Sequence, residues 1–435
     1  MSSTLNLGQA AGVKSIHAFL ASPEEQFMTI KGPGGTGKTY MVKHAVRTFE
    51  EFFKTKRLLG LDLKMPAIAF TATTNKAAEA FSHALGGDVV QTIHSFLRLV
   101  MNEDPNNPSK DILVDSDETQ IIRDTVIFID EASYVDEELK AFIDHKLGHN
   151  AKVIFMGDPA QLKNAGATTM PAFDNGYRTV ELSKIERYGE DTPIFELGVE
   201  LRKRILAGDY RIPKAPIDGK HIVWLPRGEF DRLMLKDMQS PDWTYSTSKF
   251  LAYRNKRVQQ YNKGMNQHLT GSRIFQPGDY AVNNHYVGGR KGSGIGTDRM
   301  VFIDSVVAGK EEGEPGYFIG INGKTEAVYF MPENHHRIDV IIKRLDRERI
   351  EAINHGLDVT ALEFAHRMRH VKSTWVDFRP VYAQTIYKCQ GSTFKRVYID
   401  LADIGFCMSK ELIMRQLYVA CSRAQKQLFL TGDLY

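Results

Sequence analysis

The 435-residue sequence predicts an α/β protein built on parallel sheets. Short apolar segments alternate with segments of helical periodicity, which is the pattern that parallel sheets require. A glycine-rich loop, GPGGTGKT at 32–39, joins the first expected strand to a helix, and a second expected strand ends in the acidic pair of VIFIDEAS at 126–133. Both features stand where open α/β sheets place their ligands, beyond the carboxyl ends of strands.

The first α/β stretch runs from the N-terminus to about Leu182. Its expected strands, each of which leads into a helix or a functional loop, are Phe27–Ile30, Ala67–Thr71, Val126–Ile129 and Val153–Met156. Helical spacing of apolar residues predicts a helix over 40–53. The polar segment 101–124, which contains Asn106-Asn107-Pro108, predicts a turn-rich insert.

A second α/β stretch is expected from about Ser183 to His268, resuming near Arg379. Between its two parts, residues 274–331 carry short alternating strands and many glycines, a pattern that predicts a small β-barrel. Basic helical segments are expected from 337 to 370.

Composition sets bounds on the class of protein. The length allows two to four domains, and a net charge of +3 neither supports nor excludes a nucleic-acid partner. Cys389, Cys407 and Cys421 form no CxxC motif, so we expect reduced thiols and neither a disulfide framework nor a zinc site. The N-terminus lacks a signal-peptide pattern and no apolar run approaches 18 residues, which predicts a soluble, unexported cytoplasmic protein with no membrane partner.

The glycine-rich loop has the complete pattern for binding a nucleoside triphosphate. Gly32 is followed by four residues and then by Gly37-Lys38-Thr39. In such a loop the glycine backbone wraps a phosphate, the lysine reaches the terminal phosphates and the threonine can ligate Mg²⁺. A glycine-rich turn with no ligand is the alternative, which the strand-loop-helix context disfavours. The expected nucleotide-binding residues of the loop are Gly32, Pro33, Gly34, Gly35, Thr36, Gly37, Lys38 and Thr39.

The acidic pair predicts hydrolytic chemistry. Asp130 can hold the Mg²⁺ that Thr39 also ligates, which leaves Glu131 free to orient and deprotonate the attacking water. Two adjacent acids alone are more often a solvated turn, but these acids end an apolar strand in a chain that has a P-loop. One strand later, Gln161 in FMGDPAQL offers an amide that could sense the γ-phosphate, although a glutamine there also suits surface packing.

The order of these motifs resembles that of superfamily 1 helicases. The loop at 32–39, DEAS at 130–133, GDPAQL at 157–162 and LYVACSRA at 417–424 occur in the family's order, and the likeness extends over nearly the whole chain. More narrowly, the sequence is similar to the RecD-like group, superfamily 1B, which moves 5′ to 3′ on single-stranded DNA. Upstream, LNLGQAAGV supplies Gln9 where this family has an adenine-reading glutamine.

The resemblance implies two tandem RecA-like P-loop domains with parallel sheets. The first would comprise 1–97 and 125–182, with a small insert at 98–124 as the candidate strand-separation element. The second would comprise 183–270 and 376–435, interrupted at 271–375 by an SH3-like β-barrel with basic helical segments. The implied activity is that of an ATP-dependent DNA helicase that uses ATP and Mg²⁺, translocates 5′ to 3′ on single-stranded DNA and unwinds duplex.

Roles for single residues follow from the same resemblance. Arg187 and Arg423 match the arginines that reach the γ-phosphate from the second motor domain, and Gln390 and Gly391 match the segment that couples nucleotide to strand. Hydroxyls, amides and lysines suit phosphates without reading base sequence, and a histidine ring can stack on a base. The implied DNA-contacting residues are Thr74, Asn75, Thr92, His94, Asn255, Thr385 and Lys388.

The sequence also departs from the family pattern. Tyr387 stands where relatives usually carry histidine, and Lys163-Asn164 replaces a proline-rich continuation after Gln161, so strand separation is a weaker inference than ATP hydrolysis. An RNA helicase, or a translocase that does not unwind, is the alternative within the superfamily, because phosphate-binding residues do not distinguish the sugars. A binding or regulatory module with an inert ATPase is disfavoured by the intact set of motifs.

The expected partners are single-stranded DNA and junctions between single and double strands. Single-strand-binding proteins and replication or recombination proteins are further candidates, and the pathway could be replication, recombination or repair. We expect the chain to act as a monomer in the cytoplasm, which is the host cytoplasm if a phage encodes it.

Overall fold

The computed structural model describes residues 5–60, 65–104, 107–116, 120–164, 166–185, 192–271, 274–284, 286–288, 294–323 and 328–434. Arg187 lies outside the described residues. The chain divides into two compact units. Unit 1 comprises Met1–Trp224, Ile386–Val397 and Ile404–Tyr435, and unit 2 comprises Leu225–Thr385 and Tyr398–Asp403. The domain limits implied by the resemblance stay a prediction.

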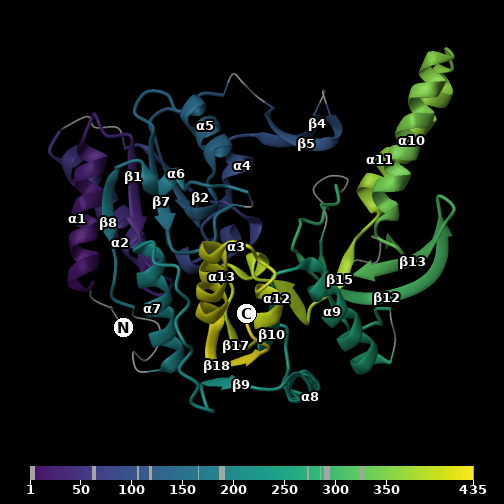
Figure 1. Ribbon diagram of the computed structural model, residues 1–435. Coiled ribbons are helices and arrows are strands. Elements are labelled where there is room, and N and C mark those ends of the chain that lie inside the picture. Colours follow the sequence, from purple (N-terminus) through teal and green to yellow (C-terminus); the bar gives the residue numbers. More distant parts are fainter. Residues whose placement is uncertain are drawn as a thin grey trace. The chain divides into compact units, whose positions relative to one another are not determined.

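A six-stranded parallel sheet forms the centre of unit 1 (Figure 1). Its order is β3-β2-β6-β7-β1-β8. The strands are β1 (Phe27–Lys31), β2 (Ala67–Ala72), β3 (Val90–Thr92), β6 (Thr125–Asp130), β7 (Lys152–Gly157) and β8 (Arg178–Glu181). The four strands that the sequence predicts are confirmed, and β3 and β8 extend the sheet at its two edges.

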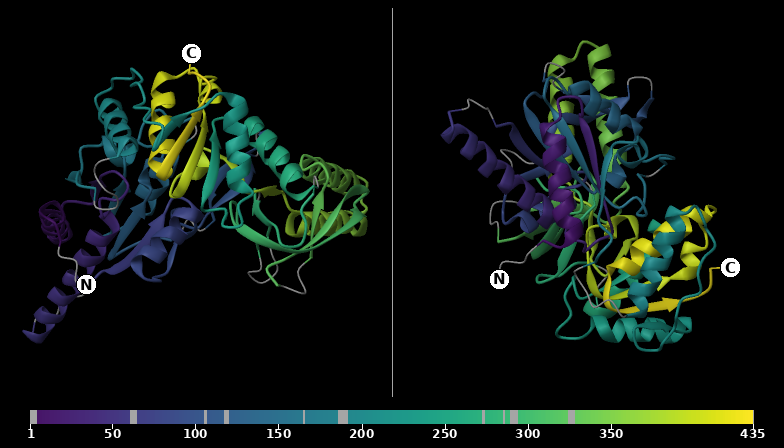
Figure 2. Two further views of the ribbon diagram at one scale, coloured as in Figure 1. Left: turned by 90° about the horizontal axis from the view of Figure 1, so that it is seen from below. Right: turned by 90° about the vertical axis from the view of Figure 1, so that its left-hand side faces the viewer.

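Helices cover both faces of this sheet (Figure 2). They are α1 (Leu7–Ala21), α2 (Lys38–Leu58), α3 (Asn75–Leu85), α4 (Ile93–Phe96), the 3₁₀ turn η1 (Ala132–Tyr134), α5 (Glu137–Lys146) and α6 (Pro171–Asp174). Successive strand residues point to opposite faces. In β6, Val126 and Phe128 therefore pack in the core under α1 and α2, while Ile127 and Ile129 pack in the core under α5. Continuous apolar strands of this kind are expected where both faces are buried.

The segment predicted as a turn-rich insert is instead largely a β-hairpin. Strands β4 (Leu99–Asp104) and β5 (Asn107–Asp115) pair antiparallel. Polar side chains do not prevent this, because the ladder is made by backbone hydrogen bonds. At the base of the hairpin the Asp115 carboxylate lies 2.6 Å from Nζ of Lys146, a side chain with no exposed surface. This ion pair fixes the hairpin to α5.

A second sheet has the order β16-β10-β17-β18-β9. Its strands are β9 (Ile222–Trp224), β10 (Ser248–Ala252), β16 (Ala383–Thr385), β17 (Phe394–Asp400) and β18 (Ala424–Thr431). The pairs β9–β18 and β10–β16 are parallel. The associated helices are α7 (Pro193–Leu206), α8 (Arg227–Met238), α9 (Asn255–Thr270), the 3₁₀ turn η3 (Tyr387–Cys389), α12 (Leu401–Ile404) and α13 (Lys410–Arg423). Two sheets with parallel strands and flanking helices agree with the predicted pair of RecA-like folds.

Unit 2 also contains an antiparallel sheet of order β14-β13-β12-β11-β15. Its strands are β11 (Tyr280–Asn283), β12 (Met300–Glu311), β13 (Glu314–Ile321), β14 (Val328–Pro332) and β15 (Phe378–Pro380). The β-rich segment that the sequence predicts is present, and its SH3-like character stays a prediction. The predicted basic helical segments are α10 (Arg337–Asn354) and α11 (Asp358–Thr374), which pack with Phe330 and Trp375.

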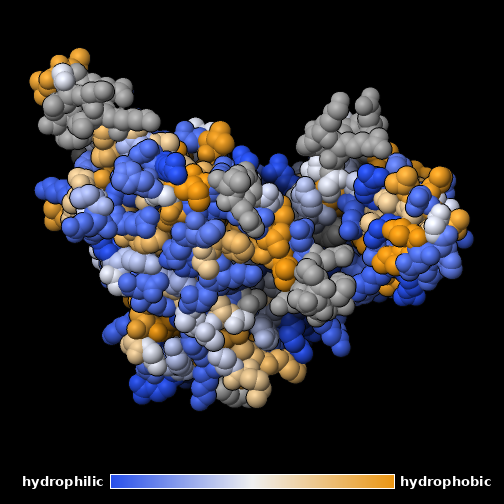
Figure 3. Space-filling model, turned by 90° about the horizontal axis from the view of Figure 1, so that it is seen from above, coloured by the Kyte–Doolittle hydropathy of each residue, from blue (hydrophilic) through white to orange (hydrophobic). Residues whose placement is uncertain are grey.

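Figure 3 shows one face of the molecule, on which hydrophilic side chains predominate and hydrophobic ones gather in small groups. Within the described ranges, no helix combines the length and the apolar character needed to cross a membrane.

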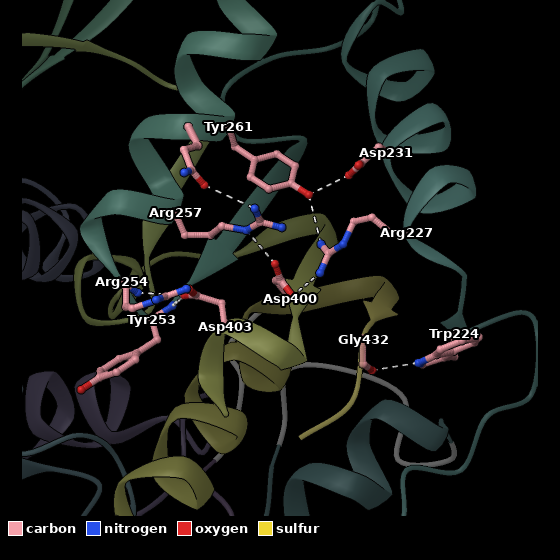
Figure 4. Close-up of polar contacts among 11 residues, drawn as sticks. Trp224, Arg227, Asp231, Tyr253, Arg254, Arg257, Tyr261, Asp400, Asp403 and Gly432 are labelled. Carbon is pink, nitrogen blue, oxygen red and sulfur yellow. Dashed lines mark hydrogen bonds and ion pairs between the residues drawn. The ribbon is translucent and has the colours of Figure 1, made fainter. Parts of the chain in front are cut away.

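Two buried carboxylates fix the carboxyl end of β17 in unit 2 (Figure 4). Asp400, which is 1% exposed, accepts from Nη2 of Arg227 at 2.5 Å and from Nε of Arg257 at 2.8 Å. Asp403 accepts from Nε of Arg254 at 2.6 Å and from the backbone nitrogens of Tyr253 and Arg254. Bonds between charged partners of this kind are stronger than neutral ones. They connect β17 to α8 and α9.

We predict that Asp400→Ala destabilises unit 2, because it leaves two arginines facing a site that no longer holds an anion. Removing one partner of a buried pair is strongly destabilising, but the arginines are partly exposed, so we expect about 2–4 kcal/mol, a melting shift of roughly 5–10 °C. Differential scanning calorimetry measures this shift. The control is Asp209→Ala, which removes a pair with the exposed Arg211 and should leave the melting temperature unchanged. Equal melting temperatures for the two variants would contradict the prediction.

Candidate nucleotide and strand-binding site

The glycine loop between β1 and α2 has the backbone shape that its sequence predicts. Gly35 and Gly37 have φ of 87° and 78°, in the left-handed region that glycine adopts without strain. A Cβ on Gly37 would lie 2.4 Å from Nε2 of Gln9, and one on Gly32 would lie 2.5 Å from the carbonyl oxygen of Leu182. Glycine is therefore required at these positions for the loop to pack against its neighbours.

Lys38 begins α2 and lies within the loop. Its Nζ donates to the carbonyl oxygens of Gly32 at 2.7 Å and Pro33 at 3.0 Å, and the buried Thr36 hydroxyl donates to Pro33 at 3.0 Å. Thr39 follows in the first helical turn and is partly buried. A helix N-terminus presents free N–H groups and favours anions. The loop thus combines backbone donors with one ammonium group, as triphosphate binding requires.

Gln9 contacts this loop from α1. Its Oε1 accepts from the backbone nitrogen of Asn6 at 3.1 Å, and its Nε2 donates to the carbonyl oxygen of Thr36 at 3.1 Å. A cavity of about 450 Å³ lies at the same end of α1, lined by residues 5–8 and 181–184. Gln9, in the first turn of α1, therefore connects that turn to the glycine loop through its side-chain amide. Its reading of adenine stays a prediction.

The two acids beyond β6 share an environment of low polarity. Burial raises the pKa of Asp130, and the Lys38 ammonium opposes that rise. Burial together with the charge of Asp130 raises the pKa of Glu131 to about 7, against the opposing charges of Arg423 and Lys38. Glu131 has a φ of 51°, an uncommon conformation for a residue with a side chain. Strained backbone and a raised pKa together are typical of a functional carboxylate.

A divalent cation fits this group of residues. Among the described residues, Glu131 Oε2 is buried without a hydrogen-bond partner, and no set of three or more histidine, cysteine or acidic residues forms a metal site by itself. Mg²⁺ is usually held by one or two protein ligands together with the phosphates of a substrate. The hydroxyl of Thr39 and the carboxylate of Asp130 are ligands of the type that this arrangement needs.

The loop after β7, which carries Gln161, is held by helix α13. Arg415 Nη1 donates to the carbonyl oxygens of Pro159 at 2.6 Å and Gln161 at 2.7 Å. Asp158, which has no exposed surface, accepts from the hydroxyl of Tyr418 and from Nε of Arg202 at 3.2 Å. Our sequence analysis did not identify these three partners. For Arg415 a signal existed, since it is a charged residue within a stretch of α13 that is otherwise buried and mostly apolar.

Three side chains from distant segments meet beside the acidic pair. Gln390 Nε2 donates to Gln161 Oε1 at 2.9 Å, and both residues are buried. The hydroxyl of Tyr134 donates to Gln390 Oε1 and lies 3.1 Å from the carbonyl oxygen of Tyr387. Gly391 follows with a φ of 75°. The structure therefore brings together the predicted Gln161 and Gln390, and it adds Tyr134, which the sequence analysis did not single out.

Arg423 ends α13 and is 6% exposed. Its guanidinium donates to the carbonyl oxygen of Ser392 at 3.1 Å and to the hydroxyl of Ser422 at 2.8 Å. Its charge also lowers the pKa of Glu131, so the guanidinium lies near that carboxylate. Of the two arginines predicted to reach the γ-phosphate, Arg423 is thus near the acidic pair. The role of Arg187 stays a prediction.

Four predicted strand-binding residues of unit 1 lie at the ends of β2 and β3 or just beyond them. Ala72 is level with Thr92 on one side and with Asp130 on the other, so the ends of these strands share one edge of the sheet with the acidic pair. Thr74 and Asn75 are exposed there. The hydroxyls of Thr74 and Thr92 accept N-cap bonds at 3.1 Å, which leaves each hydroxyl proton available to a phosphate.

His94 and Lys388 lie in the same unit. Burial lowers the pKa of His94, against the opposing charge of Asp136, so the ring is neutral at neutral pH and suited to stacking. Lys388 belongs to η3, and its carbonyl oxygen accepts from Nζ of Lys76 at 3.3 Å. Both residues thus lie near segments that carry other candidate strand contacts.

Unit 2 holds the two remaining candidates, which follow parallel strands. Asn255 is exposed at the start of α9, three residues beyond β10. Thr385 ends β16 level with Ala252, the last residue of β10, and is 7% exposed. Both therefore belong to one edge of the β10–β16 pair, although the burial of Thr385 restricts what it can contact.

We predict that Arg415→Met loosens the loop at 158–161, because two buried carbonyl oxygens lose a charged donor, a loss of about 1.5–3 kcal/mol. Hydrogen–deuterium exchange of a peptide covering this loop should become faster. The matched control is Lys410→Met, which removes a charge from an exposed position on the same helix and should leave the exchange unchanged. If the exchange rate of the loop in Arg415→Met equals that of the wild type, the prediction is contradicted, and water would then replace the guanidinium as the donor.

Comparison with known proteins agrees with this arrangement of motifs. Residues 4–205 match the model of an AAA domain, and residues 380–431 match the UvrD-like helicase C-terminal domain. The ATP-dependent DNA helicase Dda of Enterobacteria phage T4 is 22% identical over 443 aligned positions, covering 93% of this chain and 94% of that protein.

Two solved structures are also similar. The Pif1 helicase of Candida albicans matches with a TM-score of 0.43 at 15% identity, over 99% of this chain and 95% of that one. The helicase of PRRSV matches with a TM-score of 0.36 at 12% identity, over 97% of this chain and 54% of that one. The order of the motifs, the matches to the two family models and the similarity to Dda along almost its full length together support a superfamily 1B-type helicase.

Proposed function

We propose that this protein is an ATP-dependent DNA helicase that moves 5′ to 3′ along single-stranded DNA and unwinds duplex ahead of it. The observation that carries the proposal is one sheet edge along which Lys38 follows β1, the acidic pair stands at the end of β6, and the exposed Thr74 and Asn75 follow the neighbouring β2. The similarity to a phage DNA helicase supports DNA as the substrate. The direction of movement rests on the RecD-like group.

Hydrolysis would use groups that the fold already orients. Lys38 binds the terminal phosphates, and Glu131 accepts a proton from the attacking water, a role suited to a carboxylate whose pKa is about 7. Arg423 stabilises charge on the γ-phosphate, and such an arginine can contribute a factor of about 10³ to 10⁵ in rate. When Mg²⁺ is bound, Thr39 and Asp130 would hold it, and it would neutralise charge on the phosphates.

Movement would follow from nucleotide-dependent grip on the strand. Gln161 and Gln390 are hydrogen-bonded, so loss of the γ-phosphate beside Gln161 changes the environment of the segment that contains Lys388. Candidate strand contacts occur in each unit, which would allow the two units to grip in alternation. Breaking one base-pair step costs about 1.4 kcal/mol in stacking, so duplex can be opened a step at a time.

The candidate strand-separation element is the β4–β5 hairpin, and the SH3-like insert is the candidate guide for duplex. Single-stranded DNA and single-strand to duplex junctions are the proposed substrates. Single-strand-binding, replication and recombination proteins are proposed partners of a protein that acts as a monomer in the cytoplasm.

Unwinding of forked duplexes tests the proposal. With ATP and Mg²⁺, a fork with a 5′ tail should be unwound and one with only a 3′ tail should not. Hydrolysis should be stimulated more by single-stranded DNA than by RNA. Lys38→Ala should abolish hydrolysis and unwinding while single-stranded DNA binding persists, because the lysine is hydrogen-bonded within the glycine loop and is not among the candidate strand contacts.

Each part of this test has an outcome that contradicts the proposal. Unwinding from a 3′ tail would exclude the direction, and equal or greater stimulation by RNA would favour an RNA helicase. Movement along DNA without strand separation would indicate a translocase. Undiminished hydrolysis in Lys38→Ala would refute the nucleotide site.

We also predict that kcat for ATP hydrolysis rises with pH through about 7. A raised carboxyl pKa means that Glu131 is protonated below that pH and cannot accept a proton, and that it becomes a base above it. The measurement is a pH–rate profile at saturating ATP and DNA. Glu131→Gln should lower kcat by roughly 10² to 10⁴ and remove this limb of the profile. A wild-type rate that does not vary across neutral pH would show that Glu131 is not the base.

A further inference from the structure

We propose that Tyr134 is a positioning residue that couples strand binding to ATP hydrolysis, by connecting the turn after Glu131 to the turn that carries Lys388. The inference rests on the proposed function and adds a specific regulatory contact to it. Tyr134 directly follows the DEAS motif at 130–133, and it is engaged on both of the segments that it would connect, through its backbone on the first and through its side chain on the second.

On the nucleotide side, a short 3₁₀ turn connects Tyr134 to Glu131, the proposed general base. Its backbone nitrogen donates to the carbonyl oxygen of Glu131 at 3.2 Å, and that carbonyl also accepts from the hydroxyl of Thr73 at 3.0 Å. Glu131 itself has left-handed backbone geometry. A residue held in a sparsely populated conformation depends on its surroundings to stay there. Displacement of Tyr134 would therefore reorient the Glu131 carboxylate.

On the strand side, Tyr134 contacts both ends of η3. Its hydroxyl donates to Gln390 Oε1 and lies 3.1 Å from the carbonyl oxygen of Tyr387, while Lys388 stands between these two residues in the chain. The carbonyl oxygen of Lys388 in turn accepts from Lys76, which follows Asn75 on α3. Of the candidate strand contacts, Lys388 thus belongs to the turn that Tyr134 holds, and Asn75 precedes Lys76, which is hydrogen-bonded to that turn.

The hydroxyl also sets the orientation of a buried amide. Gln390 presents its oxygen to Tyr134 and its nitrogen to Gln161 Oε1, at 2.9 Å, and both glutamines are buried. Without the phenolic donor, the Gln390 amide could flip. Its oxygen would then face Oε1 of Gln161, and the hydrogen bond between the two glutamines would be lost. Burial raises the pKa of Tyr134, so the hydroxyl keeps its proton and acts as a donor at physiological pH. One proton therefore fixes the direction of the contact between the two glutamines.

Tyr134→Phe tests this inference, because it removes the donor and keeps the ring. We expect stimulation of hydrolysis by a saturating single-stranded DNA oligonucleotide to fall about three- to tenfold, the loss of one net hydrogen bond. The dissociation constant for the oligonucleotide and the KM for ATP should change by less than about twofold, because Tyr134 is proposed to act through its neighbours and not on either ligand. Steady-state ATPase assays with and without DNA, and fluorescence anisotropy, measure these quantities.

Two further variants distinguish a loss of coupling between DNA binding and hydrolysis from a general loss of activity or stability. Tyr177→Phe removes a tyrosine hydroxyl whose hydrogen bond is to the neighbouring Asn175, and it should leave stimulation unchanged. Gln390→Met should also lower stimulation, and the double variant Tyr134→Phe/Gln390→Met should be no worse than the more affected single variant, since both act on one contact.

The outcomes distinguish this inference from the proposed function. If DNA does not stimulate the wild-type enzyme, the proposed function fails and the inference fails with it. If the wild type is stimulated and Tyr134→Phe is stimulated equally, the inference alone is overturned. A variant whose basal and stimulated rates fall by the same factor would also overturn it, because Tyr134 would then have only a structural role.

Discussion

The site depends on the balance of charge among three carboxylates at the ends of two adjacent strands. Asp130 ends β6 and Glu131 follows it, Asp158 follows β7, and these strands are neighbours in the sheet. Buried carboxylates are costly unless cations or donors compensate them. For Asp130 and Glu131 the compensation comes from Lys38 in the glycine loop and, for Glu131, also from Arg423, whose charges oppose the rise in the pKa of these carboxyl groups.

Asp158 shows how the same constraint arranges the surrounding helices. Its carboxylate is satisfied by Arg202 on α7 and Tyr418 on α13, and Arg415 on α13 satisfies the carbonyls of the following loop. The packing of α13 thereby serves two purposes. It completes the hydrogen bonding of the Gln161 loop, and it delivers Arg423, at its carboxyl end, to the neighbourhood of Glu131. In the part of the chain that the structure describes, Oε2 of Glu131 is buried without a hydrogen-bond partner, consistent with a group that must accept a proton.

The sequence predicted those parts of the site that depend on short-range pattern. The glycine loop, the acidic pair and the strands of the first sheet have local signatures, because spacing and apolar alternation determine them. The β4–β5 hairpin was missed, since its two short apolar runs, 99–101 and 112–114, are separated by a polar stretch whose composition is typical of turns. The contacts of Tyr134 with Gln390 and of Arg415 with Gln161 join residues more than 250 positions apart. No local pattern specifies which distant donor meets which acceptor.

Acidic residues also stand at the end of a strand in the second sheet, where Asp400 ends β17 and Asp403 follows it. Their partners differ from those of the acidic pair in the first sheet, where hydrolytic chemistry is proposed. Asp400 is paired with Arg227 and Arg257, and Asp403 with Arg254, so these carboxylates have fixed cationic partners and no glycine loop stands beside them in the sequence. Their effect is to hold backbone in place. Asp403 binds the backbone nitrogen of Arg254, immediately before Asn255, the candidate strand contact at the start of α9. Carboxylates at the strand ends of the first sheet are thus left with incomplete compensation, as the proposed reactivity requires. In the second sheet arginines complete the compensation, and the carboxylates hold the backbone beside a candidate strand contact.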